Sequence, residues 1–218
     1  ASRSAPGGNP GSEDGDSDEK PAHRVYLDAF YIDASEVTNA RYSKFMQATG
    51  RQAPRYWNDT KFNASDQPVV GVTWDDAEAY CTWASKRLAT EAEWEKAARG
   101  TDGRTYPWGD QWERTKANTS EGGPGRPTPV GSYEGGKSPH GAYDTAGNVW
   151  EWVADWYGEQ YYRNSPGRNS RGPERSDGRV LRGGSWSFNP FNARASDRNW
   201  YIPDRRYDDV GLRCAKTP

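Results

Sequence analysis

The chain has 218 residues, enough for one domain with a sizeable hydrophobic core. Its formal net charge of -2 argues against a nucleic-acid-binding surface, which needs a basic stripe, and no apolar run is long enough to cross a membrane. Low aliphatic content beside 11 Trp, 13 Tyr, 24 Gly and 15 Pro residues indicates a loop-rich fold with an aromatic core rather than a helical bundle.

In chain order, the first segment is polar, acidic and rich in Gly, Ser and Pro. It predicts a disordered tail or linker over residues 1–22, followed by one domain over residues 23–218. The domain is expected to open with a strand, because "RVYLDAFYIDASEVTN" alternates apolar and polar residues and places Val25 and Leu27 on one face.

Three helices are predicted next. The first begins at the N-cap Thr38 and ends at a glycine. The second opens at Thr73, and its apolar spacing turns Cys81 toward the core. The third opens with a capping box, in which Thr90 and Glu93 each bond the other's free backbone N–H, and it also ends at a glycine.

The sequence changes character from Thr101 onward, where Gly, Pro, Asn and Asp recur every few residues and no long helix is expected. Short strands are predicted in "RVLRGGSW" and in the closing "VGLRC", and "GNVWEWVADWY" brings three tryptophans close together. The predicted fold class is therefore α+β, with few helices, short strands and long loops. Loops of this length fit a compact domain if they pack on aromatic rings or carry function.

One series of phrases runs along the chain in order: "FYIDASEVTNARYSKF", "PVVGVTWDDAEAYCTWASKRLATEAEWEKAARG", "YPWGD", "GNVWEWVADWY", "RVLRGGSW" and "VGLRCAK". Together they resemble the formylglycine-generating-enzyme domain, also called the sulfatase-modifying-factor domain. The resemblance covers roughly Val25 to Lys216. It implies an irregular α+β fold of the C-type-lectin type.

The resemblance also bears on catalysis. In the enzymes of that family, two cysteines just after the "GGSW"-like turn carry out the oxidation, whereas the matching segment here, "SFNPFNARASDR", contains no cysteine. A related branch oxidises sulfur substrates on iron held by a separate His-rich domain, and the chain has only two histidines. The sequence therefore predicts that the chain is not an enzyme. The alternative is a formylglycine-generating-type oxidase or a degenerate relative of one.

The two cysteines, Cys81 and Cys214, resemble the structural disulfide pair of the family. Closing so long a loop would stabilise the fold by roughly 4 kcal/mol. Two buried free thiols are the alternative. With only two cysteines and two histidines, a zinc or iron site built on several such ligands is nearly excluded.

A calcium site is implied by the resemblance in "YDTAGNVWE". Asp144 and Glu151 would supply carboxylate oxygens, and Gly147 and Val149 would supply main-chain carbonyls. Alternatively, Asp144 only hydrogen-bonds the turn and Glu151 is solvated. A second calcium site of the family would fall around Asn118, where the spacing departs from that of the enzymes. No organic cofactor is expected.

The stretch "GGSWSFNPFNARASDRNWYIPDRRYDDVGLRC" mixes aromatic and charged residues with no helical or strand period. It resembles the variable proteins of diversity-generating retroelements, in which a reverse transcriptase rewrites the C-terminal region by mutating template adenines. Their templates typically resemble "GGSWNNNPNNxRxxNRNNNNPDNRNNNxGFR". The resemblance makes residues 183–213 the variable region, and the fixed letters persist at Gly183, Gly184, Ser185, Trp186, Pro190, Arg194, Arg198, Pro203, Asp204, Arg206, Gly211 and Arg213.

The genetic code gives an independent check. Changing only the adenines of an Asn codon reaches Ser, Phe, Tyr, Asp, Ile and Arg. Those types, Arg aside, stand where the template would hold Asn, at Ser187, Phe188, Phe191, Asp197, Tyr201, Ile202, Tyr207, Asp208 and Asp209. Trp200 needs a different template codon, and Arg205 is compatible with either origin.

These variable residues, with Trp200 and Arg205, predict a ligand-binding surface on a fixed scaffold. Tyr, Trp and Phe give a large contact area with few rotors, and Ser, Asn and Asp give adaptable hydrogen bonds. The expected partner is a variable ligand, a protein rather than a nucleic acid. The alternative is a buried aromatic core with ordinary polar loops. Arg194 and Arg198 are expected to form structural ion pairs, and Trp186 to pack inward.

Overall fold

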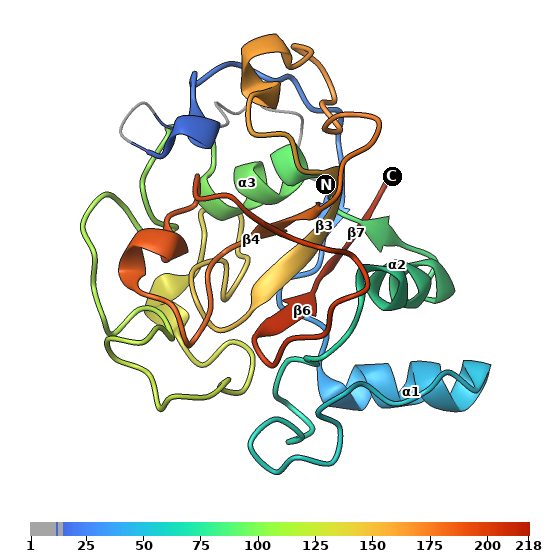
Figure 1. The fold of residues 1–218 in the computed structure, drawn as a ribbon. Coiled ribbons are helices and arrows are strands. Elements are labelled where there is room, and N and C mark those ends of the chain that lie inside the picture. The colour runs from blue at the N-terminus through green and yellow to red at the C-terminus, as the bar shows by residue number, and fades with distance from the viewer. Residues whose placement is uncertain (1–11, 13–14) are drawn as a thin grey trace.

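The computed structural model of the chain describes residue 12 and residues 15–218 (Figure 1). Its three α-helices begin where their caps predict, and the first and third end at the predicted glycines. Thr38, Thr73 and Thr90 each accept a hydrogen bond from a backbone N–H in the first turn of a helix. The helices are α1 (Asn39–Thr49), α2 (Trp74–Trp83) and α3 (Glu91–Arg99). None of the helices in the described part of the chain could span a membrane.

Seven short strands form two sheets in the described residues. The first has the order β1-β7-β2 and is antiparallel, and the second has the order β5-β4-β3-β6, in which β3 pairs with β6 in parallel. The strands are β1 (Tyr31–Ile32), β2 (Arg87–Leu88), β3 (Trp150–Trp156), β4 (Arg179–Arg182), β5 (Asn199–Tyr201), β6 (Val210–Leu212) and β7 (Cys214–Lys216). Single turns of 3-10 helix lie before β1, at η1 (Ser17–Glu19), and between later strands, at η2 (Glu134–Gly136), η3 (Tyr161–Asn164) and η4 (Pro190–Ala193).

The main core lies between α1, α2 and the second sheet, and aromatic rings make up much of it. Trp150 and Trp152 of β3 are fully buried. The rings of Tyr42 and Phe45, on α1, pack against the ring of Tyr80, on α2. The indole N–H of Trp152 donates to a main-chain carbonyl at 3.2 Å. The predicted aromatic core is therefore present, but its polar ring atoms are hydrogen-bonded only in part, because the indole N–H of Trp150 has no partner among the described residues.

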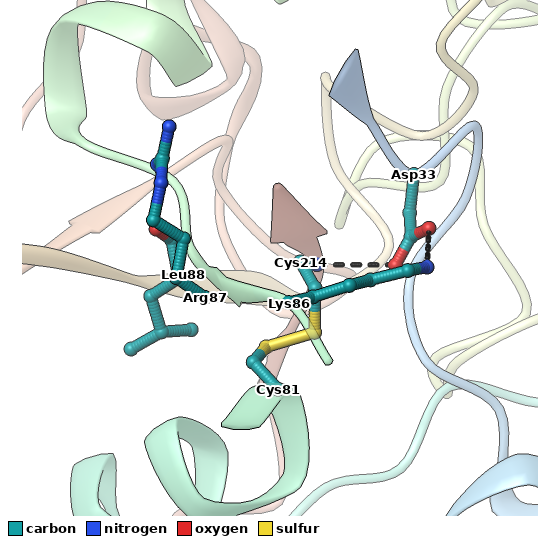
Figure 2. The surroundings of a disulfide bond; sticks show 6 residues. All are labelled: Asp33, Cys81, Lys86, Arg87, Leu88 and Cys214. Carbon is teal, nitrogen blue, oxygen red and sulfur yellow. Dashed lines mark hydrogen bonds and ion pairs between the residues drawn. A yellow bond between two sulfur atoms is a disulfide. The ribbon is translucent and has the colours of Figure 1, made fainter. Parts of the chain in front are cut away.

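A disulfide joins Cys81, on α2, to Cys214, at the start of β7. Figure 2 shows the bond beside the ion pair of Asp33 and Lys86, with β2 next to it. Both cysteines are fully buried. The pairing implied by the family resemblance is therefore present, and both thiols of the chain are used in it.

The structure departs from the sequence-based expectation near the N-terminus. Val25 and Leu27 are buried together as predicted, but the ladder of β1 begins only at Tyr31, because the neighbouring stretch makes one isolated bridge, from Tyr26 to Arg168. Part of the predicted tail is also ordered: Ser17–Glu19 form a turn in which the buried Glu19 carboxylate accepts from Arg194 and the main-chain carbonyl of Asp18 accepts from Arg198. Residues 1–11 and 13–14 of that tail lie outside the described residues.

Candidate functional site

The segment predicted to be variable leaves β4 through the turn at Gly183 and Gly184. Both glycines have positive φ, and a Cβ on Gly184 would lie 2.8 Å from the main-chain oxygen of Asn192. The chain then passes through η4, forms β5 beside β4, and enters β6 beside β3. The fixed "GGSW" turn is thus required by backbone geometry.

Four fixed arginines tie this segment to the scaffold. Arg194 pairs with Glu19 at 2.7 Å and Arg198 with Glu91 at 2.7 Å, both with buried partners. Arg206 pairs with Asp76 at 2.7 Å, and Arg213 pairs with Glu151 at 2.6 Å. Arg194 and Arg198 therefore make the structural ion pairs that the sequence predicts.

The variable positions divide by exposure. Phe191, Trp200, Ile202 and Tyr207 are 46%, 41%, 44% and 36% exposed. Phe188, Tyr201 and Asp208 are half-buried. Six of the predicted variable side chains face solvent: Ser187, Phe191, Trp200, Ile202, Arg205 and Tyr207.

Two predicted surface residues, Asp197 and Asp209, are instead buried, at 2% and 5% exposure. The main-chain carbonyl of Asp197 accepts from Arg182 at 2.5 Å, which pulls this residue inward. Asp209 directly precedes β6, and its carboxylate accepts from Ser185 at 2.8 Å. Burial raises the pKa of Asp197 to about 8, and it also raises the pKa of Asp209.

The half-buried aromatics connect the surface to the core. The Phe188 ring meets Trp150 edge to face at 5.5 Å between centroids. Tyr201 packs against the main core and lies 4.2 Å from the ring of Tyr207. Trp186 is only half-buried, with the Lys61 ammonium 4.3 Å above its ring, so it packs inward less completely than predicted.

The predicted calcium ligands do not form an oxygen cage. Both carboxylate oxygens of Glu151 accept hydrogen bonds from Arg213 at 2.6 Å, and one also accepts from the indole N–H of Trp94. Glu151 is fully buried, so it is not solvated either. One carboxylate oxygen of Asp144 accepts from the Gly131 N–H at 2.6 Å. Glu151 is thus committed to an ion pair with Arg213, and its carboxylate does not fit the calcium-ligand role that the resemblance implies.

Beside these residues lies a buried acid that the sequence analysis missed, Glu36. Burial and the neighbouring carboxylates of Asp144 and Glu151 raise the pKa of Glu36 well above its usual range. The amide of Asn148 donates to Glu36 at 3.0 Å and so connects it to Asn118, the centre of the second predicted calcium site. Within the described part of the chain, one oxygen of Glu36 and the side-chain oxygen of Asn118 have no hydrogen-bond partner.

A second cluster of carboxylates joins Asp16, Glu19 and Asp197, whose oxygens approach within 4.8 Å of one another. Arg194 supplies the compensating charge, because its guanidinium contacts both Glu19 and Asp197. Sequence analysis did not predict this contact, since Glu19 stands in a segment whose composition is typical of disorder. The buried acids of α3, Glu91 and Glu95, were missed for a similar reason: glutamate early in a helix is usually solvated.

This combination of features defines a loop-rich α+β domain of the C-type-lectin type. Helices come first, two small sheets follow, and a fixed "GGSW" turn opens a segment with exposed aromatics. Residues 4–218 match the family described as "Sulfatase-modifying factor enzyme 1-like domain", and the chain belongs to that family.

Several curated relatives are enzymes. The chain is 36% identical to the formylglycine-generating enzyme of Streptomyces coelicolor, over 90% of this chain and 81% of the enzyme. It is also 36% identical to hercynine oxygenase of Mycolicibacterium smegmatis, over 90% of this chain and 55% of that protein. A Chlamydia caviae protein named serine/threonine-protein kinase pkn1 is 36% identical over 94% of this chain, which spans 36% of its length.

These relatives overturn the prediction that the chain is not an enzyme. That prediction treated the missing cysteine pair after Trp186 as decisive. The missing pair removes a thiol reaction at those positions, but relatives that share the whole domain include two differently named enzymes. The absence of one pair of residues therefore does not separate this chain from the enzymes of its family.

Solved structures give a further likeness. The structure titled Treponema denticola variable protein 1 superposes with a TM-score of 0.86 at 25% identity, covering 99% of this chain and 94% of that one. The Major Tropism Determinant P3c variant superposes with a TM-score of 0.52 at 16% identity, over 97% of this chain and 61% of that one, which supports the fold alone.

Proposed function

We propose that the chain is a variable protein of a diversity-generating retroelement and that it binds a protein ligand through its C-terminal segment. One observation carries the proposal. Seven large hydrophobic side chains are exposed in the described residues, and four of them, Phe191, Trp200, Ile202 and Tyr207, lie at predicted variable positions. Exposed apolar side chains gathered on one segment are typical of a binding surface.

The anchoring of the segment supports the same proposal. Arg194, Arg198 and Arg213, at three of the fixed positions, are buried and paired with acids of the scaffold, while most of the variable positions face outward or lie at the boundary. Substitution at the outward positions removes little packing and leaves these ion pairs in place. The same scaffold can therefore carry many different surfaces.

Binding can be tested with an array of purified extracellular protein domains, each measured against this chain. The test variant replaces Phe191, Trp200, Ile202 and Tyr207 with Ser, and the matched control replaces the exposed aromatics Tyr26, Tyr31 and Trp83. We expect the four-site variant to lose bound ligand at least about a hundredfold, because exposed aromatic anchors dominate interfaces. Stability of both variants should change by only about 0.5 kcal/mol per site.

Equal binding by the two variants would contradict the proposal.

A genomic observation tests the retroelement part of the proposal separately. An Asn-rich near-repeat of the coding sequence for residues 183–213 should lie beside a reverse transcriptase gene. If the locus contains no such repeat, the diversification part of the proposal fails while the binding assay still stands.

A second candidate function is an oxidase activity, and sequence identity to the two named enzymes favours it. Both cysteines are in the buried disulfide, so such an activity would need other residues at the site. Incubation with a cysteine-containing sulfatase-type peptide, oxygen and copper, followed by mass spectrometry, tests it. Aldehyde above a heat-inactivated control would favour this candidate.

A further inference from the structure

The N-terminal turn η1 contacts the variable segment at two points. Glu19, which is fully buried, accepts from both guanidinium nitrogens of Arg194, at 2.7 and 3.0 Å. The carboxylate of Asp18 accepts from the Tyr157 hydroxyl at 2.9 Å, and its main-chain carbonyl accepts from Arg198 at 2.8 Å. In Figure 1 this blue turn lies at the same end of the molecule as α3 and away from α1.

Each contact continues to an exposed variable ring. The Arg194 guanidinium lies 3.8 Å from the centroid of the Phe191 ring. The Tyr157 ring stacks on Trp200 with centroids 5.7 Å apart and planes at 22°. Two chains of contact thus run from adjacent acids in the N-terminal segment to two side chains of the candidate binding surface.

The Glu19 contact is closed to water. Its carboxylate also accepts from the Asp16 N–H at 2.9 Å, and a Cβ on Gly15 would lie 2.1 Å from it, so the chain wraps over this group. Hydrogen bonds from Arg194 and from its neighbours lower the pKa of Glu19 although burial opposes this. A charged bidentate pair in such surroundings fixes the direction of Arg194, because both donors must stay in one plane.

We propose that Asp18 and Glu19 are positioning residues that set the orientation of Trp200 and Phe191 on the binding surface. This inference rests on the proposed function. A ring that is already held in place loses less conformational entropy when a ligand binds. The contacts of η1 therefore raise affinity for whichever side chains the variable positions carry. Because η1 lies outside the variable region, it can act in the same way in every variant that keeps Arg194 and Tyr157.

The two chains of contact can be separated by experiment in the full chain without a ligand. Glu19→Gln weakens the hydrogen bonds to Arg194, which contacts the Phe191 ring. Asp18→Ala removes the carboxylate that accepts the hydrogen bond of the Tyr157 hydroxyl. Hydrogen exchange, read by mass spectrometry over Pro190–Ala193, reports the first path. The fluorine NMR signal of Trp200 in fluorotryptophan-labelled protein, assigned with Trp200→Phe, reports the second.

We expect Glu19→Gln to speed exchange over Pro190–Ala193 about tenfold, a factor that corresponds to about 1.4 kcal/mol of local stability, and to leave the Trp200 signal in place. Asp18→Ala should move or broaden the Trp200 signal and leave exchange over Pro190–Ala193 within about twofold. The control is Asp33→Asn, which weakens a half-buried ion pair with Lys86, beside the disulfide in Figure 2. It should move neither readout.

The proposal is overturned if neither variant moves its own readout, or if each variant moves both readouts as a general loss of stability would. It is also overturned if the control moves them equally. None of these outcomes bears on whether a ligand binds, so the proposed function would stand or fall by the array experiment alone.

Discussion

At the residue scale, the fold depends on charged groups buried in pairs. Arg182, Arg213, Glu19 and Glu95 are among the most deeply buried side chains of the described structure, and each belongs to an ion pair. Removing one partner of such a pair leaves the other charge without compensation, which costs far more than the pair contributes. Single substitutions at these positions should therefore have large effects on stability.

A substitution of Glu151 distinguishes its role in an ion pair with Arg213 from a role as a calcium ligand. Glu151→Gln leaves Arg213 buried with reduced compensation, so we expect a loss of about 3–5 kcal/mol of unfolding free energy. The loss should be the same in calcium and in chelator, measured by urea unfolding. A loss that occurs only when calcium is present would restore Glu151 as a calcium ligand.

The raised pKa of Asp197 predicts that the stability of the fold depends on pH. Burial raises the pKa of the folded-state carboxyl to about 8 from an ordinary 3.8, so the folded protein holds a proton that the unfolded chain has released. Stability is then lost as the pH rises from about 4 to about 8. Asp197→Asn should remove up to about 1.4 kcal/mol per pH unit of this slope, read from unfolding between pH 5 and 7.

A matched control for this slope is Asp102→Asn, because hydrogen bonds from Arg104 lower the pKa of Asp102 to about 2, outside the tested range. Asp155 has a pKa raised to about 8 by burial and should keep part of the slope in both variants. An Asp197→Asn protein with the wild-type slope would mean that Asp197 is ionised in the fold.

At the scale of elements, capping made the helices predictable. The Thr38, Thr73 and Thr90 caps place each helix start to the residue, since the side-chain acceptor and the first free N–H groups are adjacent in sequence. Short strands were harder. β4 and β6 follow from "RVLR" and "VGL", but β5 contains Asn199 and forms only because β4 lies beside it.

The candidate site was predictable in part for the same reason. Template spacing located the segment and its exposed rings, which are local in sequence. It misplaced Asp197 and Asp209, because their burial depends on Arg182 and on the pairing of β6 with β3. Glu19 could not be found at all, since its partner Arg194 lies 175 residues away.

The disulfide is a covalent link between two elements that are distant in sequence. It ties α2 to β7 across a sequence separation of 133 residues. The double change Cys81→Ala and Cys214→Ala should cost about 4–5 kcal/mol of unfolding free energy in the oxidised protein, because the unfolded chain regains loop freedom. The measurement is denaturant unfolding of both forms. If the variant unfolds at the wild-type midpoint, the bond contributes no stability.

At the scale of the whole molecule, β7 connects distant parts of the chain. Its residues pair with β1 on one side and β2 on the other, so Ala215 faces both Ile32 and Arg87. Removal of residues 214–218 should abolish cooperative unfolding, since the central strand of a sheet has no substitute. Circular dichroism during a urea titration measures this. A cooperative transition in the truncated chain would contradict the central role of β7.

The position of β7 also sets an order of events during synthesis. The ribosome must translate the whole segment 183–213 before Cys214–Lys216 exists, and only then can β1 and β2 be joined through it. A frameshift or an early stop codon within that segment yields a chain without its last strand, which is exposed to proteolysis as an unfolded protein. Completion of the fold thus depends on an intact reading frame through the last coding segment.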